Sequence, residues 1–117
     1  MGRVFLQYID QSQLYVCANC ETHLTDKEQI ISKNFHGKTG KAYLFNKVVN
    51  VFYGPEEDKE MMTGLHKVCD IHCKQCMKLV GWTYMHAYAE SEKYKEGKFI
   101  VEKMLMRKKV IPKQNDA

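Results

Sequence analysis

The sequence predicts a mainly β, antiparallel domain that is fixed at one end by a metal ion. Most apolar segments are rich in aromatic and β-branched residues and are bounded by turn residues, which is typical of strands. Four of the five cysteines form two C-x2-C pairs, Cys17/Cys20 and Cys73/Cys76, with 52 residues between Cys20 and Cys73. With 117 residues, the chain has the length of one domain with a modest core.

The two cysteine pairs predict one structural zinc ion. A C-x2-C turn directs two sulfurs towards one point, so two turns supply a closed tetrahedral shell for Zn²⁺. The expected ligands are Cys17, Cys20, Cys73 and Cys76. Disulfides or redox-active thiols are the alternatives, and the repetition of the pair disfavours them. Because zinc-binding thiols are typical of reducing compartments, the nucleus and the cytoplasm are the expected locations.

The first expected elements lie between the two pairs. Thr25 and Glu28 form a capping box that predicts a short helical turn. Residues 41–53 are apolar at both alternating sets of positions, which predicts one central strand buried on both faces. The glycine and proline at 54–55 are expected to end this strand, and residues 56–60 then form an acidic, solvated turn.

Three more strands are expected around and after the second pair. Residues 61–72 lead into it, and residues 81–89 leave it. Residues 97–106 alternate after a glutamate-glycine turn and predict the last strand. The picture is a mostly antiparallel domain with zinc at one end.

The chain divides into an N-terminal strand or arm (1–13), a zinc-binding domain (14–107) and a basic, polar, disordered tail (108–117). No apolar stretch is long enough to span a membrane, so we expect no membrane association. The net charge is +4. Residues 93–113 hold eight lysines and arginines against two glutamates, a local charge of +6 that could contact phosphate or an acidic partner. A solvated strand edge and tail is the preferred interpretation.

The strand after the second pair carries a row of large rings. Its period of two places these residues on one face: Trp82, Tyr84, His86 and Tyr88. They either pack in the core against the opposing sheet or form an aromatic-walled groove for a peptide or a small molecule.

Three other polar or reactive residues invite an explanation. Asparagine is depleted in strands, so Asn46 and Asn50 need a hydrogen-bonding duty, either to neighbouring backbone or, for Asn46, to a ligand amide. Cys69 shares a strand face with Cys73 and could approach the metal. Because the four-thiolate shell is full, we expect Cys69 to be a buried spectator thiol.

Longer motifs in fixed order surround the cysteine pairs: CANC, ISKNFHG, GKAYLFNKVVNV, MTGLH, LVGWTYMHA and KYKEGKFIVE. From about Val16 to Glu102 they resemble the yippee-like proteins, small eukaryotic zinc proteins, and the opening MGR-x-FL resembles one branch of that family. The resemblance implies the four cysteine ligands and a β-tent fold, in which two antiparallel sheets meet at an angle with zinc at the apex.

The resemblance also implies an interaction role. The β-tent is shared with the ligand-binding domain of cereblon, whose aromatic cage beside the second knuckle binds a cyclic imide. Residues 81–84 (GWTY) are similar to one cage segment, and Asn46 falls where that domain has a pocket asparagine. Met62 and Val68 occupy the positions of two further cage tryptophans. Some yippee-like proteins are associated with a ubiquitin ligase of the CTLH (GID) type, and others with centrosome and spindle structures.

The leading hypothesis is a non-enzymatic zinc-binding interaction module. It would be a protein–protein adaptor or a subunit of a CTLH-type ubiquitin-ligase complex that presents a groove containing Trp82, Tyr84, Asn46 and His86. The alternative is a small-molecule or nucleic-acid binding protein. Nucleic acid is disfavoured because the rings and most basic residues fall on different strands. A methionine-sulfoxide-reductase-like enzyme is least favoured. Reductases of the B type have their nucleophilic cysteine downstream of the second C-x2-C pair, and no cysteine follows Cys76 here.

Overall fold

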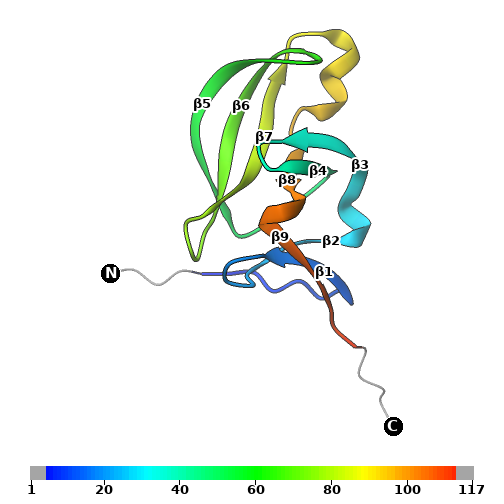
Figure 1. The fold of residues 1–117 in the computed structure, drawn as a ribbon, viewed down its shortest axis with the longest axis vertical. Helices are drawn as coiled ribbons and strands as arrows, with labels where there is room; N and C mark the ends of the chain where they lie inside the picture. The colour runs from blue at the N-terminus through cyan, green and yellow to red at the C-terminus, as the bar shows by residue number, and fades with distance from the viewer. Residues whose placement is uncertain (1–4, 113–117) are drawn as a thin grey trace.

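Residues 5–112 are described by a computed structural model, in which the strands form two antiparallel sheets (Figure 1). The smaller sheet has the order β2-β1-β9 and contains β1 (Gln13–Cys17), β2 (His23–Asp26) and β9 (Met106–Val110). The larger sheet has the order β3-β4-β8-β7-β6-β5. Its strands are β3 (Ile30–Gly37), β4 (Gly40–Phe45), β5 (Val51–Met61), β6 (Gly64–Cys73), β7 (Leu79–Ala87) and β8 (Phe99–Glu102). The expected mainly β fold of two antiparallel sheets is confirmed.

Short 3-10 helices connect some strands: η1 (Lys27–Gln29), η2 (Glu90–Lys95) and η3 (Lys103–Leu105). Within residues 5–112, no helix is long and apolar enough to cross a membrane. The first residues of the MGR-x-FL motif and the last five residues of the expected tail lie outside the described part of the chain.

The expected strand over 97–106 and the expected tail boundary need correction. The strand is interrupted after β8 by η3, because the chain leaves the larger sheet there and joins the smaller one as β9. Lys108, Lys109 and Val110 belong to β9 and pair with β1, so they are strand residues and not the start of a tail. Apolar and polar residues continue to alternate through this region, so the sequence gives no sign of the interruption. The strand is interrupted because the chain changes sheets.

The expected single strand over 41–53 is also wrong. β4 ends at Phe45, and β5 begins at Val51 on the far edge of the same sheet. Residues 46–50 form a connection beside the smaller sheet, where the Val49 amide donates to the Leu24 carbonyl (2.7 Å). β5 then runs through Gly54 and Pro55 with a bulge between Tyr53 and Glu56, so the acidic residues 56–60 are in a strand. An edge strand tolerates proline because one side has no pairing partner.

The helical turn near residue 27 is present, but its cap differs from the expected one. The Glu28 amide donates to the Asp26 carboxylate (3.0 Å), so Asp26 caps η1. The Thr25 hydroxyl instead donates to the Lys47 carbonyl (2.6 Å) and fixes the connection between β4 and β5.

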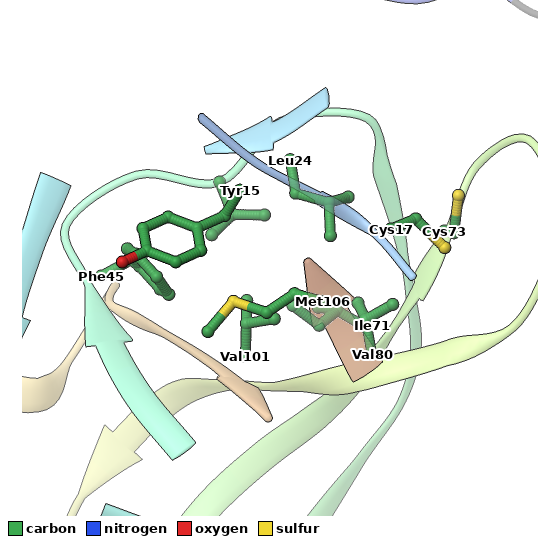
Figure 2. Packing of buried hydrophobic residues seen from close by; sticks show 10 residues of the cluster. Tyr15, Cys17, Leu24, Phe45, Ile71, Cys73, Val80, Val101 and Met106 are labelled. Atoms are coloured by element: carbon green, nitrogen blue, oxygen red, sulfur yellow. The ribbon is translucent and has the colours of Figure 1, made fainter. Parts of the chain in front are cut away.

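The main hydrophobic cluster lies where the two sheets meet (Figure 2). β1 and β9 of the smaller sheet supply Tyr15 and Met106, and strands of the larger sheet supply Phe45, Ile71 and Val101. The Tyr15 and Phe45 rings meet edge to face with centroids 5.5 Å apart. Burial of each large apolar side chain contributes about 1.5–3 kcal/mol, so this cluster stabilises the junction of the sheets.

The segment before β1 is fastened beside the first cysteine pair. The Asn50 side chain donates to the carbonyls of Gln7 (2.8 Å) and His23 (2.7 Å) and accepts from the Gln7 amide (2.7 Å). The Ile9 amide donates to Nδ1 of His23 (3.1 Å). The expected hydrogen-bonding duty of Asn50 is therefore present, and it is directed to the backbone.

Replacement of Asn50 by alanine should destabilise the protein. It removes three hydrogen bonds at a buried residue whose φ of 60° favours asparagine or glycine over alanine. The expected loss in free energy of unfolding is about 2–4 kcal/mol, measured by denaturant unfolding of the zinc-loaded protein. Asn50→Gly keeps the backbone freedom and isolates the side-chain contribution. A loss below about 0.5 kcal/mol for Asn50→Ala would contradict this role.

Acid should loosen the segment before β1 through His23. Burial, and then the charge of Lys109, lower the pKa of His23, and its Nδ1 accepts a hydrogen bond only when unprotonated. The pKa of His23 in the unfolded chain is about 6.5. The contribution of this hydrogen bond to stability is therefore complete above that pH, and it is lost as the pH falls through the lower pKa of the folded protein. The Ile9 amide resonance should therefore shift between pH 7.5 and 5, and His23→Gln should abolish the shift. An unchanged titration in His23→Gln would refute this assignment.

Candidate metal centre and adjoining groove

The two cysteine pairs adopt the same local backbone structure. In the first, the Glu21 amide donates to the Cys17 carbonyl (2.8 Å). In the second, the Met77 amide donates to the Cys73 carbonyl (2.8 Å). Glu21 and Met77 both have positive φ (62° and 69°), which reverses the chain directly after each pair. Each turn follows a strand, β1 in the smaller sheet and β6 in the larger, so the pairs bring the two sheets together.

The four sulfurs have the spacing that a tetrahedral zinc site needs. All four Sγ atoms lie within 4.8 Å of one another, with 3.6 Å between Cys17 and Cys76 and 3.5 Å between Cys20 and Cys73. Four Zn–S bonds of about 2.3 Å in a tetrahedron place sulfurs about 3.8 Å apart. The thiols are free, which removes the disulfide alternative. Figure 2 shows the sulfurs of Cys17 and Cys73 at the margin of the main hydrophobic cluster.

The electrostatics of the cluster also fit a bound dication. Burial raises the pKa of Cys17 to about 12 and also raises the pKa of Cys73. Burial opposes ionisation of Cys76 too, but hydrogen bonds from the Lys78 amide and the Asn19 side chain lower its pKa to about 6. The buried thiols therefore need an adjacent cation to become thiolates, and Zn²⁺ supplies that charge. The chain binds a single structural zinc ion through these four cysteines.

Polar side chains around the cluster connect the two turns. The Thr22 hydroxyl lies 3.0 Å from the Cys20 sulfur and donates to the Gln75 side-chain oxygen (2.8 Å). Contacts of this kind orient metal ligands. Cys69 is buried and is absent from the four-sulfur cluster, and burial raises its pKa. This agrees with the expected spectator thiol.

A groove of about 700 Å³ lies on the larger sheet. β3 lines one side and the tip of the β5–β6 hairpin the other, while β6, β7 and β8 form the floor and η2 closes one end. In Figure 1 this hairpin and η2 lie at the end of the molecule opposite the smaller sheet. Apolar and aromatic side chains dominate the lining: Phe35, Met61, Met62, Val68, Trp82 and Tyr84.

Two of the four expected groove residues are in this groove. Trp82 and Tyr84 both line it, with ring centroids 6.3 Å apart, and Tyr84 is also part of the core beneath it. Asn46 is absent from the lining; it is exposed and accepts a hydrogen bond from Nζ of Lys98 (2.6 Å). His86 is also absent from the lining, and its Nδ1 lies 3.0 Å from the Glu96 carboxylate.

A bulge in β7 explains the position of His86. Lys67 pairs with His86 and the next residue, Val68, pairs with Tyr84, so Met85 is an extra residue in β7. The alternation of faces therefore changes after Tyr84, and the expected row of four rings is broken. His66 of β6 lies beside Tyr84 instead, with ring centroids 5.2 Å apart.

Sequence reasoning missed two buried charged residues in the groove. Lys95, which we expected in a solvated basic strip, is only 2% exposed, and its Nζ contacts the Glu92 carboxylate (2.6 Å) and the Thr63 hydroxyl (2.9 Å). Glu102 is also 2% exposed and accepts two hydrogen bonds from Thr39, from its amide (2.7 Å) and its hydroxyl (2.6 Å). Glu92 lies three residues before Lys95 in η2, but Thr63 and Thr39 come from distant segments, and the packing that buries both charges is not visible in the local sequence.

Loss of one zinc ligand should abolish folding. Apparent zinc binding in structural sites contributes about 10–16 kcal/mol, comparable to the total stability of a domain. Cys73→Ser should therefore bind no zinc, aggregate and lose its cooperative thermal transition, measured by metal analysis and calorimetry. Cys69→Ser is the matched control and should retain one zinc per chain. A soluble, metal-free Cys73→Ser protein that melts cooperatively would disprove this dependence.

Known proteins match both the sequence and the fold. The family model described as "Yippee zinc-binding/DNA-binding /Mis18, centromere assembly" matches residues 13–116. Protein yippee-like 3 from Homo sapiens and from Bos taurus is 50% identical over 101 residues, which cover 86% of this chain and 85% of each relative. The crystal structure of the Mis18 'Yippee-like' domain aligns with a TM-score of 0.68 at 12% identity, covering 88% of this chain and 100% of that one, and so shares the fold. With this sequence match and the four-cysteine zinc site, the chain belongs to the Yippee–Mis18 family.

Proposed function

We propose that the protein is a non-enzymatic interaction module in which zinc stabilises the fold and the groove around Trp82 binds a protein partner. The observation that carries this proposal is the combination of a closed four-cysteine shell with a separate aromatic groove. A zinc ion held by four thiolates has no open position for a substrate or a reactive water. The zinc therefore has a structural role, and recognition falls to the groove.

The groove has the properties of a recognition site. Its volume of about 700 Å³ is within the range of about 300–1,000 Å³ for ligand sites. Trp82 is half-buried, so one part of the ring is fixed and another can contact a partner, as is common in interface anchors. β7, which carries Trp82 and Tyr84, begins three residues after the zinc ligand Cys76, so the metal also positions the groove floor.

The proposed partner is a protein of a ubiquitin-ligase complex of the CTLH type, in the nucleus and the cytoplasm. The likeness to yippee-like proteins supports this choice of partner, and the requirement for reduced thiols supports the location. A small molecule in the same groove is the alternative occupant.

Nucleic-acid binding is a second candidate with its own observation. The description of the matching family includes DNA binding, and β9 exposes Arg107, Lys108 and Lys109 at an edge of the smaller sheet. None of these residues lines the groove, so basic and aromatic contacts would not converge on one strand of nucleic acid.

Affinity capture from a cell extract, with mass spectrometry of the bound proteins, tests the proposal. Trp82→Ala should reduce capture of the specific partner at least tenfold while one zinc remains bound, because it removes a central anchor. Tyr84 is unsuitable for truncation, since its loss would leave a core cavity that costs about 3–5 kcal/mol.

Two control variants locate the contact. Tyr53→Ala removes a half-exposed ring outside the groove and should not change capture. Lys108→Glu/Lys109→Glu reverses charge on β9 and should also leave capture unchanged. Equal capture by wild type and Trp82→Ala would refute the groove as the binding site. Loss of capture in the β9 variant alone would show that the partner binds the basic edge of the smaller sheet.

A further inference from the structure

We propose that the groove receives an arginine side chain of the partner, with the guanidinium placed between the Trp82 ring and the carboxylates of Asp70 and Glu102. This inference rests on the proposed function and names the chemistry that the groove recognises. Three observations support it: the strand register around Trp82, the absence of ion pairs to these two carboxylates within residues 5–112, and the position of Lys95 among aromatic rings of the groove.

The register places Asp70 directly opposite Trp82 on one side and Glu102 diagonally across from Trp82 on the other side. Asp70 of β6 pairs with Trp82 of β7, which pairs with Ile100 of β8, so these residues form one row across the sheet. Directly paired residues have Cβ atoms about 4.5–5.5 Å apart. Glu102 follows Ile100 by two residues and lies on the same face of β8. Asp70, Trp82 and Glu102 all line the groove.

These two carboxylates lack a basic partner among residues 5–112. Lys95 is paired with Glu92, and Lys59 with Glu57 (3.7 Å), whereas no ion pair there includes Asp70 or Glu102. One Glu102 oxygen, Oε1, accepts both hydrogen bonds from Thr39. Its other oxygen has no hydrogen bond within the described residues. A buried carboxylate without a cation is costly, so an incoming cation would be favoured.

The Glu102 side chain is held in a fixed position. It packs against Gly37 of the β3–β4 hairpin so closely that a Cβ on residue 37 would lie 2.5 Å from the Glu102 Cδ. This packing and the two hydrogen bonds from Thr39 hold the carboxylate against the β3–β4 hairpin. A carboxylate that is already held in place loses less conformational entropy when it binds a cation.

The groove already accommodates one cation among aromatic rings. The Lys95 ammonium lies 5.4 Å from the ring centroids of Phe35 and of Tyr84, and 5.9 Å from that of Tyr94. Tryptophan offers the strongest cation–π surface, and Trp82 has no cation over its ring within residues 5–112. Arginine suits the site better than lysine because its planar guanidinium stacks on rings and presents five donors to carboxylates.

The single tryptophan of the chain provides a direct readout. The full-length zinc-loaded protein, labelled with ¹⁵N, would be titrated with the peptide Ac-Gly-Ala-Arg-Ala-Gly-NH₂ while the indole N–H resonance is followed. We expect a saturable shift, with binding at least tenfold weaker when citrulline, the neutral isostere, replaces arginine. Binding should also weaken as salt is raised.

Two charge-neutralising variants test the carboxylates separately. Glu102→Gln keeps an oxygen that can accept from Thr39, and Asp70→Asn changes a half-buried residue, so that one variant remains informative if the other folds poorly. Each should weaken binding of the arginine peptide at least fivefold without loss of zinc. Equal binding of the citrulline peptide, no indole shift with the arginine peptide, or unaltered affinity in folded variants would each overturn the inference.

Capture experiments separate this inference from the proposed function. A partner that is lost with Trp82→Ala but captured normally by Glu102→Gln and Asp70→Asn would overturn the arginine assignment and leave the groove as the docking site. A partner lost with all three variants would support both.

Discussion

The structure depends on the four-cysteine cluster, because it connects the two sheets at the end where they meet. One pair follows β1 of the smaller sheet and the other follows β6 of the larger, and their sulfurs converge within 4.8 Å. The smaller sheet has only three strands of four or five residues, which bury limited apolar surface by themselves. Metal binding therefore adds to folding free energy where the hydrophobic contribution is modest.

The four-cysteine cluster also fixes the position of the hydrophobic core and of the groove floor. Cys17 and Cys73 pack against the main hydrophobic cluster, so metal coordination and apolar burial fix the same junction. The chain leaves the second cysteine pair as β7, and this strand carries Trp82 and Tyr84. A groove floor on a central strand of a six-stranded sheet is rigid, which favours recognition by a preformed surface.

Departures from the expected strands share one physical cause. Residues 46–50 and η3 interrupt segments whose composition continues to favour strand, and each interruption occurs where the chain moves to a different sheet or a different sheet edge. Pro55 has the opposite outcome: a strong turn signal is tolerated within β5 because that strand lies at an edge. Where these strands end depends on pairing between distant segments, and the composition of a short stretch of sequence does not predict that pairing.

The sequence by itself determined the zinc ligands, the mainly β class and most strand cores. Thiol spacing and alternation are local properties, and they act within one turn or one strand. Only the tertiary structure decided which side chains share the groove. The bulge at Met85 removed His86 from the Tyr84 face, and long-range packing brought Lys95 and Glu102 into the groove from segments whose charge predicts exposure. A one-residue change in register reverses the face of every following side chain, and this change depends on the partner strand.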